Sequence, residues 1–225
     1  MTRIGIFDYG AGNLHSLLKA IEGDGRDVSV DTDIRAALEA DILILPGVGA
    51  FGAAVAAMRG EQGYVRDALA DGKPCLGVCL GMQMLFDASE EDAGSGTREG
   101  NRKGEARIGK RESGAGIGLI PGQVRRLMTR KVPHMGWNEI EWIADGRPEA
   151  GSARREMHCA YFANAYVCRP EDNSSVLAWT THQNARFASV VRKANTVGVQ
   201  FHPEKSSDAG RTFVNAVIDE LVQCK

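Results

Sequence analysis

A cysteine stands at the centre of a glycine-framed motif, Gly77-Val78-Cys79-Leu80-Gly81, directly after an apolar stretch at residues 73–76. This is the cysteine form of the G-x-S-x-G nucleophile elbow, in which a buried strand enters a sharp turn and a helix follows at once. The glycines let neighbouring backbone come close, and the free N–H groups of the helix favour negative charge on a thiol or an oxyanion. The motif predicts a thiolate nucleophile at Cys79 for acyl transfer, although a buried structural cysteine is the commoner fate of a single cysteine.

A histidine and a glutamate stand two residues apart at His202 and Glu204, after the apolar stretch at residues 196–200. A base that faces Cys79 has to lie at the end of such a strand. Glu204 can accept a hydrogen bond from the far imidazole nitrogen, which sets the tautomer and favours the imidazolium. Alone this would be an ordinary surface pair, but with the elbow it predicts a Cys-His-Glu triad.

A third glycine-rich segment, residues 45–49, ends an earlier apolar strand. Gly47 and Gly49 allow backbone angles that turn an N–H toward a developing oxyanion, although a plain strand-to-helix turn also needs flexible residues. Gly10-x-Gly12 near the N-terminus lacks the third glycine of a dinucleotide-binding loop, because His15 stands there. We therefore reject dinucleotide binding.

Strands and helices alternate through the first half of the chain, and short strands with turn signals fill the second half. The expected strands are residues 3–8, 28–30, 41–45, 73–78, 124–128, 137–142, 161–168, 175–181, 187–192 and 196–201. The expected helices are residues 14–22, 34–40, 50–58, 64–70, 80–88 and 206–223. Repeated βα units predict an α/β fold with a central, mostly parallel sheet and helices on both faces, whose ligands bind outside the carboxyl ends of the strands. We expect a smaller antiparallel sheet from the second half, a single domain over residues 1–225, and a mobile insertion loop at residues 93–116, which is poor in large apolar residues.

The composition excludes several classes of protein. The 225 residues are 43 % hydrophobic and 25 % charged, and the formal net charge of −2 implies no overall attraction to nucleic acid or to a membrane. No secretory segment and no apolar run long enough to span a bilayer is visible. Five cysteines without a C-x-x-C pair argue against a disulfide framework or a zinc site. We expect a cytoplasmic protein with no metal and no cofactor.

Further motifs make the sequence similar to a known family. GVCLGMQ at residues 77–83 and FHPE at 201–204 resemble the class I (triad) glutamine amidotransferases, over nearly the whole chain except residues 93–116. FDYGAGN at 7–13, LPGVG at 45–49, PHMGWN at 133–138 and VQFHPEKS at 199–206 resemble, within that family, the glutaminase subunits of imidazole glycerol phosphate synthase in histidine biosynthesis. The resemblance implies a flavodoxin-like fold and attack of the Cys79 thiolate on the side-chain amide of glutamine, with His202 moving protons and Glu204 orienting His202.

The resemblance also implies which residues surround the substrate. They are Gly47, Val48, Gly49 and Leu80 for the oxyanion, Gln83 and Glu91 for glutamine, and Ala165 and Tyr166 beside its α-carboxylate. In the family the segment at residues 47–49 rearranges before it donates a hydrogen bond, which couples activity to the partner.

One departure from the family lies at Asn164 and Ala165, where a histidine and a hydroxyl residue are usual. Losing one hydrogen bond to a charged group costs about 1.5–3 kcal/mol. We therefore expect a glutamine KM raised by about one to two decades, unless His182 and Gln183 compensate.

Ammonia released by such an enzyme is wasted unless it is consumed nearby. The resemblance therefore implies a heterodimer with a (β/α)8 cyclase subunit, which uses the ammonia to make imidazole glycerol phosphate and AICAR; this chain is too short to hold that barrel as well. The residues expected to face the partner are Tyr9, Asn13, Trp137, Asn138 and Tyr161. Two alternatives stay open: the glutaminase of another class I amidotransferase, such as pyridoxal phosphate synthase, against which residues 133–138 argue, and a non-catalytic scaffold, against which the intact triad argues.

Overall fold

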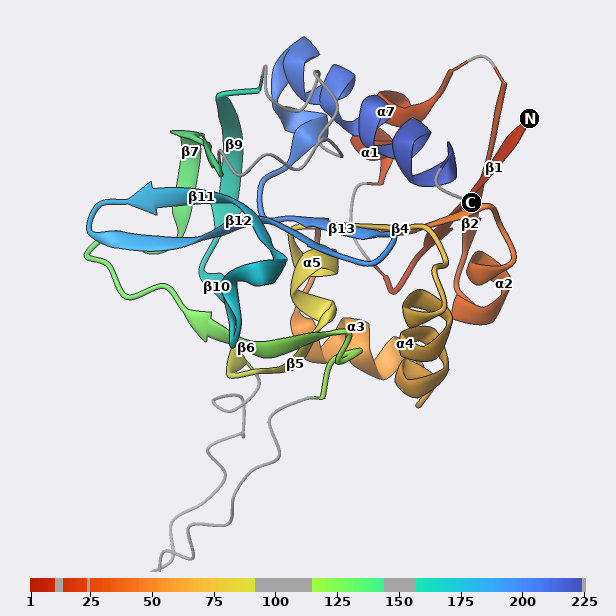
Figure 1. Ribbon diagram of the computed structural model, residues 1–225, viewed down its shortest axis with the longest axis horizontal. Helices are drawn as coiled ribbons and strands as arrows, with labels where there is room; N and C mark the ends of the chain where they lie inside the picture. The colour runs from red at the N-terminus through yellow and green to blue at the C-terminus, as the bar shows by residue number, and fades with distance from the viewer. Residues whose placement is uncertain (11–13, 24, 92–114, 144–156, 224–225) are drawn as a thin grey trace, which may run out of the picture.

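An eight-stranded mixed sheet runs through the computed structural model, which describes residues 1–10, 14–23, 25–91, 115–143 and 157–223 (Figure 1). Its strands are β1 (Thr2–Phe7), β2 (Arg26–Asp31), β3 (Ile42–Leu45), β4 (Cys75–Val78), β8 (Glu141–Trp142), β11 (Val176–His182), β12 (Ala185–Lys193) and β13 (Thr196–Val199). They lie in the order β2-β1-β3-β4-β13-β12-β11-β8. Neighbours from β2 to β13 are parallel, and the pairs beyond β13 are antiparallel.

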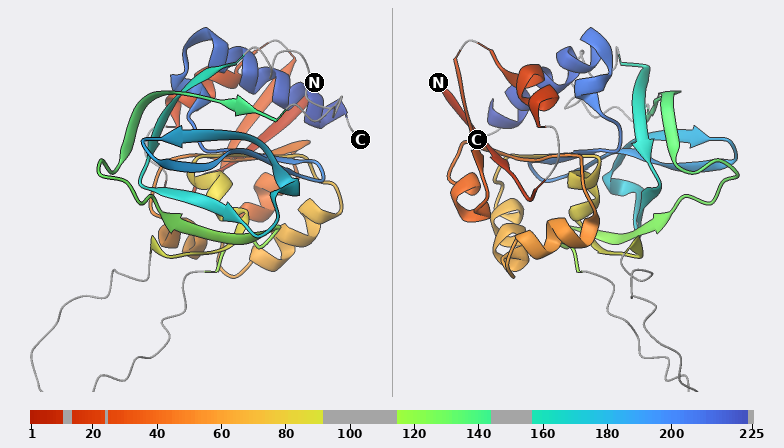
Figure 2. Two further views of the ribbon diagram at one scale, coloured as in Figure 1. Left: turned by 60° about the vertical axis from the view of Figure 1, so that its left-hand side comes forward. Right: turned by 180° about the vertical axis from the view of Figure 1, so that it is seen from behind.

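Helices cover both faces of this sheet (Figures 1 and 2). One face carries α1 (His15–Ile21) and α7 (Ser207–Gln223), and the other carries α2 (Ile34–Leu38), α3 (Phe51–Ala57), α4 (Gln62–Ala70) and α5 (Leu80–Met84). Along β3, Ile42 and Ile44 join the core under α1 and α7, whereas Leu43 and Leu45 join the core under the other helices. Successive side chains of a strand point to opposite faces, so a strand covered on both faces is apolar throughout. The predicted α/β fold with a mostly parallel central sheet is confirmed.

The remaining strands form two small sheets, where we expected one. β5 (Phe86–Ser89), β6 (Ile120–Arg126) and β10 (Tyr166–Pro170) form one in the order β10-β6-β5, and β7 (His134–Glu139) pairs with β9 (Cys159–Asn164) in the other. The expected strand at residues 161–168 breaks at Ala165, because β9 pairs with β7 whereas β10 pairs with β6. The expected strand at residues 137–142 breaks at Ile140 for the same reason, since β8 pairs with β11.

The helix expected at residues 80–88 is wrong in its second half, because α5 ends at Met84 and β5 follows. The N–H of Ile117 donates to the Met84 carbonyl at 2.7 Å, and the N–H groups of Leu119 and Ile120 donate to the Leu85 carbonyl at 2.9 and 3.0 Å. A distant segment thus takes the carbonyls that a continuing helix would use. Tertiary pairing overrides local helical spacing here.

Most of the loop expected at residues 93–116 lies outside the described residues. The last two residues of the expected loop, Ala115 and Gly116, pair with β5 instead. Ala115 pairs with Ala88, and the N–H of Gly116 donates to the Asp87 carbonyl at 2.8 Å. Among the helices in the described ranges, none is both long and apolar enough to cross a membrane.

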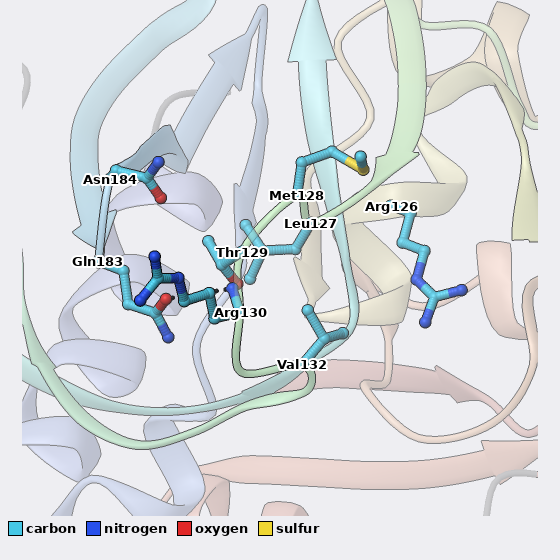
Figure 3. Close-up of a pocket in the computed structure, with 8 residues that line it drawn as sticks. All are labelled: Arg126, Leu127, Met128, Thr129, Arg130, Val132, Gln183 and Asn184. Atoms are coloured by element: carbon cyan, nitrogen blue, oxygen red, sulfur yellow. Dashed lines mark hydrogen bonds between the residues drawn. The ribbon is translucent and has the colours of Figure 1, made fainter.

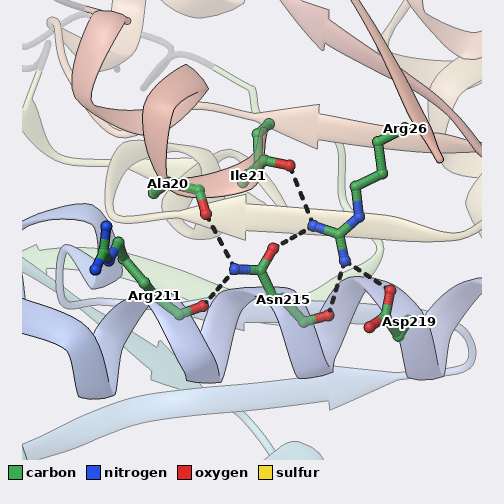
Figure 4. A network of polar contacts seen from close by, with 6 residues as sticks. All are labelled: Ala20, Ile21, Arg26, Arg211, Asn215 and Asp219. Atoms are coloured by element: carbon green, nitrogen blue, oxygen red, sulfur yellow. Dashed lines mark hydrogen bonds and ion pairs between the residues drawn. The ribbon is translucent and has the colours of Figure 1, made fainter. Parts of the chain in front are cut away.

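A polar network joins α7 to the end of α1 (Figure 4). Asn215 Nδ2 donates to the Ala20 carbonyl at 3.0 Å. The Arg26 guanidinium donates to the Ile21 carbonyl at 3.1 Å, to the Asn215 side-chain oxygen and to Asp219 at 2.6 Å. The last carbonyls of a helix have no partner within the helix, so this network satisfies the end of α1 and anchors α7 beside it.

We expect Asn215→Ala to lower the free energy of unfolding by about 2–3 kcal/mol, because it leaves the Ala20 carbonyl and one Arg26 N–H without their partner. Urea denaturation followed by circular dichroism measures the loss. Arg211→Ala, one turn earlier, is the matched control: its ion pair with Asp208 lies at the surface and should contribute below about 1 kcal/mol. Equal losses in the two variants would contradict the role given to Asn215.

Candidate active site

Three neighbouring parallel strands bring the predicted catalytic residues to one edge of the central sheet. β4 lies between β3 and β13. Cys79 follows β4, residues 46–49 follow β3, and His202 comes shortly after β13. The carboxyl ends of parallel strands meet at the same edge, where ligands of open α/β sheets bind. Residues that are far apart in the sequence therefore share one site.

Cys79 has the backbone of a nucleophile elbow. Its φ is 47°, in the left-handed region that residues with a Cβ rarely adopt. Its N–H donates to the Val199 carbonyl at 2.6 Å, which holds the turn against β13. A Cβ on Gly81 would overlap the Leu45 carbonyl oxygen, and one on Gly77 would lie 2.7 Å from the backbone of Gly81. The flanking glycines thus allow the close backbone approach that the motif predicts.

His202 lies between Cys79 and Glu204. Its Nδ1 is 2.8 Å from Glu204 Oε1, and the two side chains are only 3 % and 7 % exposed. The ring also hydrogen-bonds with the Cys79 side chain. Burial by itself lowers the pKa of His202, but Cys79 and Glu204 outweigh burial and raise this pKa to about 10. An imidazolium at neutral pH therefore faces the nucleophile, in an orientation that the carboxylate sets.

A cavity of about 220 Å³ is lined by both Cys79 and His202. Its wall contains every predicted oxyanion and substrate residue: Gly47, Val48, Gly49, Leu80, Gln83, Glu91, Ala165 and Tyr166. Glu204 is not on the wall, because it lies behind His202. Three further lining residues were not among the predicted site residues: Ala163, Asn164 and Lys205. In the sequence, Asn164 was marked only by its departure from the family pattern, and Ala163 and Lys205 only by their nearness to Ala165 and Glu204.

Two side chains on the cavity wall are held by contacts within the chain. Gln83 Nε2 donates to the Tyr166 carbonyl at 3.2 Å and to Gln200 Oε1 at 3.3 Å. Glu91 Oε2 accepts a hydrogen bond of 3.0 Å from the N–H of Phe51, the first residue of α3. Both side chains are therefore oriented before any ligand binds.

Asn164, one of the two residues that depart from the family pattern, lies on the same wall. Its Nδ2 donates to the Tyr166 carbonyl at 3.1 Å, while its buried Oδ1 has no hydrogen-bond partner within the described part of the chain. Leaving a buried acceptor unpaired costs about 1–3 kcal/mol.

Gly47 and Gly49 are needed for different reasons, whereas we expected backbone freedom at both. Gly49 has a φ of 135°, which favours glycine. At Gly47 the requirement is space: a Cβ there would lie 3.0 Å from Cε1 of His202 and 3.1 Å from Cβ of Cys79. Any side chain at position 47 would press on the catalytic pair.

Tyr9, which we expected to face a partner, is buried at 8 % exposure beneath residues 46–49. Its hydroxyl donates to the Pro46 carbonyl and forms a hydrogen bond with the backbone of Val48, and its ring packs against Gly49. Burial, with Cys79 nearby, raises the pKa of Tyr9 well above its usual value, so the phenol stays neutral. Tyr9 therefore supports the oxyanion segment from below and presents little surface.

The other residues expected to face a partner belong to the small β7–β9 sheet. Trp137 is 55 % exposed and meets the ring of Tyr161 edge-on, with 6.4 Å between centroids. Asn138 Nδ2 donates to the Thr181 carbonyl at 3.1 Å. Met135, also exposed, lies two residues before Trp137 and so shares its face of β7. Asn13 lies outside the described residues.

A larger cavity, of about 820 Å³, lies between the chain after β6 and the β11–β12 turn (Figure 3). Its lining is Arg126, Leu127, Met128, Thr129, Arg130, Val132, Gln183 and Asn184. This wall offers guanidinium and amide groups but no nucleophile beside an acid or a base, so its size does not make it the reaction site. His182 and Gln183, which we considered as residues that could compensate at the substrate site, are absent from the wall of the Cys79 cavity.

Comparisons with known proteins agree with this geometry. A family model described as "Glutamine amidotransferase class-I" matches residues 5–218. A protein of Halobacterium salinarum named "Imidazole glycerol phosphate synthase subunit HisH" is 42 % identical over 226 residues, which cover 96 % of this chain and 94 % of the relative. A protein of the same name from Gloeothece citriformis is 35 % identical and covers 98 % of this chain and 97 % of the relative.

The solved structure described as "Structure of PurLQS from Thermotoga maritima" superposes with a TM-score of 0.66 at 16 % identity, and covers 100 % of this chain and 99 % of its own. This likeness concerns the fold alone. The family model and the relatives decide the family: the chain belongs to the class I glutamine amidotransferases.

Proposed function

We propose that this chain hydrolyses glutamine to glutamate and ammonia, and supplies the ammonia to a separate synthase subunit that makes imidazole glycerol phosphate. One observation carries the proposal: a strained cysteine elbow and a buried His–Glu pair open into a cavity whose wall holds Glu91 and the backbone of residues 47–49. The name of the relatives at 35–42 % identity, imidazole glycerol phosphate synthase subunit, supports the choice of synthase.

The reaction proceeds in two steps. The Cys79 sulfur attacks the side-chain amide carbon of glutamine, and the imidazolium of His202 gives its proton to the departing nitrogen, so that ammonia leaves and a thioester remains. His202, now neutral, takes a proton from water as the water oxygen attacks the thioester carbon. Glutamate is released, and the thiolate and imidazolium are restored. Throughout, Glu204 holds the Nδ1 side of the ring.

The substrate's charged groups match the cavity. Glu91 is the carboxylate on its wall and suits the α-ammonium group, as the resemblance implies. Lys205, on the same wall, adds a positive charge for the α-carboxylate beside the backbone of Ala165 and Tyr166. The raised glutamine KM expected from Asn164 and Ala165 stays a prediction, and a steady-state KM measurement tests it.

Oxyanion stabilisation is incomplete in this conformation. Leu80 begins α5, and the first N–H groups of a helix have no partner within it. The backbone of Val48, by contrast, hydrogen-bonds with the Tyr9 hydroxyl. One missing oxyanion donor costs about 10²–10³ in rate. We therefore expect slow hydrolysis by the isolated chain and an increase of that order when a partner rearranges residues 46–49.

The partner in this proposal is a cyclase subunit with a (β/α)8 barrel, as the resemblance implies. The exposed face of β7, with Met135 and Trp137, supports such a docking surface, because aromatic and methionine side chains are enriched at interfaces. Glutamate production by the chain, alone and with the cyclase subunit of the same organism and its substrate, tests the whole proposal. Stimulation supports it. Stimulation only by the partner of another synthase would favour the alternative glutaminase, and no hydrolysis with any partner would favour the scaffold.

A further inference from the structure

A second glutamine, Gln200, contacts the nucleophile. It directly follows β13, two residues before His202, and its side chain is fully buried. Its Nε2 lies 3.5 Å from Sγ of Cys79 in donor geometry. Gln200 is absent from the cavity wall, so it does not reach a bound substrate. Among the described residues, its side chain contacts the site only through the sulfur of Cys79 and the side chain of Gln83.

The orientation of the Gln200 amide is set by its neighbour. Gln83 Nε2 has two N–H groups, and the acceptors near them are the Tyr166 carbonyl at 3.2 Å and Gln200 Oε1 at 3.3 Å. Because Oε1 of Gln200 receives a donor, its NH₂ group is the end that faces Cys79. A chain of amide hydrogen bonds therefore runs from the substrate wall through Gln83 and Gln200 to the sulfur.

The contact between the Gln200 amide and the Cys79 sulfur suits the chemistry of the site. The attacking group is a thiolate, and a donor directed at an anion is stronger than a neutral hydrogen bond. His202 approaches the same sulfur but has to release its proton during the reaction, whereas an amide N–H does not. Gln200 thus supplies a donor that stays in place after His202 has given up its proton.

We propose that Gln200 is a positioning residue that holds the Cys79 sulfur for attack and links its position to Gln83 on the substrate wall. This inference rests on the function proposed above for the site. It goes beyond that function, because it gives the buried amide a role that the triad does not contain.

The test measures how fast iodoacetamide alkylates Cys79 in the full-length chain at neutral pH, with peptide mass spectrometry to resolve each cysteine. Exposed Cys159 is the internal reference. Gln200→Met keeps the volume but removes the donor, and we expect about tenfold slower alkylation of Cys79 with no change at Cys159. Gln200→Glu keeps the acceptor for Gln83 but places a carboxylate near the sulfur, so we expect a larger decrease. Asn195→Ala, at the other end of β13, removes a buried amide that bonds the Leu221 carbonyl, and should leave the Cys79 rate unchanged.

Steady-state kinetics separates positioning from packing. If Gln200 holds the sulfur, Gln200→Met lowers kcat about tenfold with a smaller effect on KM. Wild-type alkylation and kcat in folded Gln200→Met would overturn the inference, since a residue that only fills space tolerates this isosteric change. If Gln200→Met does not fold, Gln200→Glu decides in the same assay. The alkylation assay does not use glutamine. A chain that hydrolyses no glutamine would therefore refute the proposed function of the site, and the alkylation rates would still decide the role of Gln200.

Discussion

Cys79→Ala is expected to lower glutamine hydrolysis by about four to six orders of magnitude, because the thioester cannot form without the sulfur and the triad acts as a unit. Glutamate release, measured with the partner subunit present, reports the loss. The substitution removes a single atom from a buried turn that glycines and the Val199 carbonyl already hold. We therefore expect the variant to fold and to bind its partner normally.

Cys159→Ala is the matched control for this result, because Cys159 is exposed at the start of β9, away from the cavity wall. It should hydrolyse glutamine at the wild-type rate. Hydrolysis that survives Cys79→Ala would rule out the thiolate mechanism.

His202→Gln is expected to lower kcat by about 10²–10⁴, because it removes the group that protonates the leaving nitrogen and later takes a proton from water. The pH profile gives a second readout. With the pKa of His202 raised to about 10, the wild-type rate should persist to alkaline pH and fall as this proton is lost near pH 10. Glu204→Gln removes one of the two groups that raise this pKa, so its alkaline decline should begin at lower pH.

The same pKa predicts how stability depends on pH. A histidine whose pKa is raised by folding stabilises the folded state fully below its unfolded pKa of about 6.5, and this contribution is lost as the pH rises through about 10. The free energy of unfolding should therefore decline across that window in the wild type and decline less in His202→Gln. His158→Gln, at an exposed position, is the control. An identical decline in His202→Gln would show that the buried pair does not titrate as described.

Local patterns predicted the elements around the site well, because the physical requirements there are local. A strained turn needs glycines at fixed offsets from Cys79, and a strand covered on both faces needs an unbroken apolar run such as β3 or β4. The predictions fail where a distant segment supplies the decisive partner. Residues from Ile117 onward end α5 early, and separate partners split the strands on either side of Ala165.

Buried polar residues were the hardest to assign from the sequence. In the sequence, Gln200 lies at the end of an apolar strand and Tyr9 lies in a glycine-rich segment. In the structure, Gln200 is buried against Cys79 and Tyr9 is buried against residues 46–49. No periodicity marks such positions, because a buried polar side chain depends on the acceptor or donor that the fold places opposite it.

The sequence by itself determined which chemistry this protein can perform, because a cysteine between glycines and a His-x-Glu pair are local patterns, each confined to a few residues. Only the tertiary structure decided that these pieces form one site, because it places β4 between β3 and β13. Strand order depends on how all the apolar faces pack together, which is a property of the whole chain rather than of any segment. For the same reason, only the fold shows that Tyr9 supports the oxyanion segment. The role of Gln200 in holding the sulfur of Cys79 is a proposal that the alkylation experiment tests.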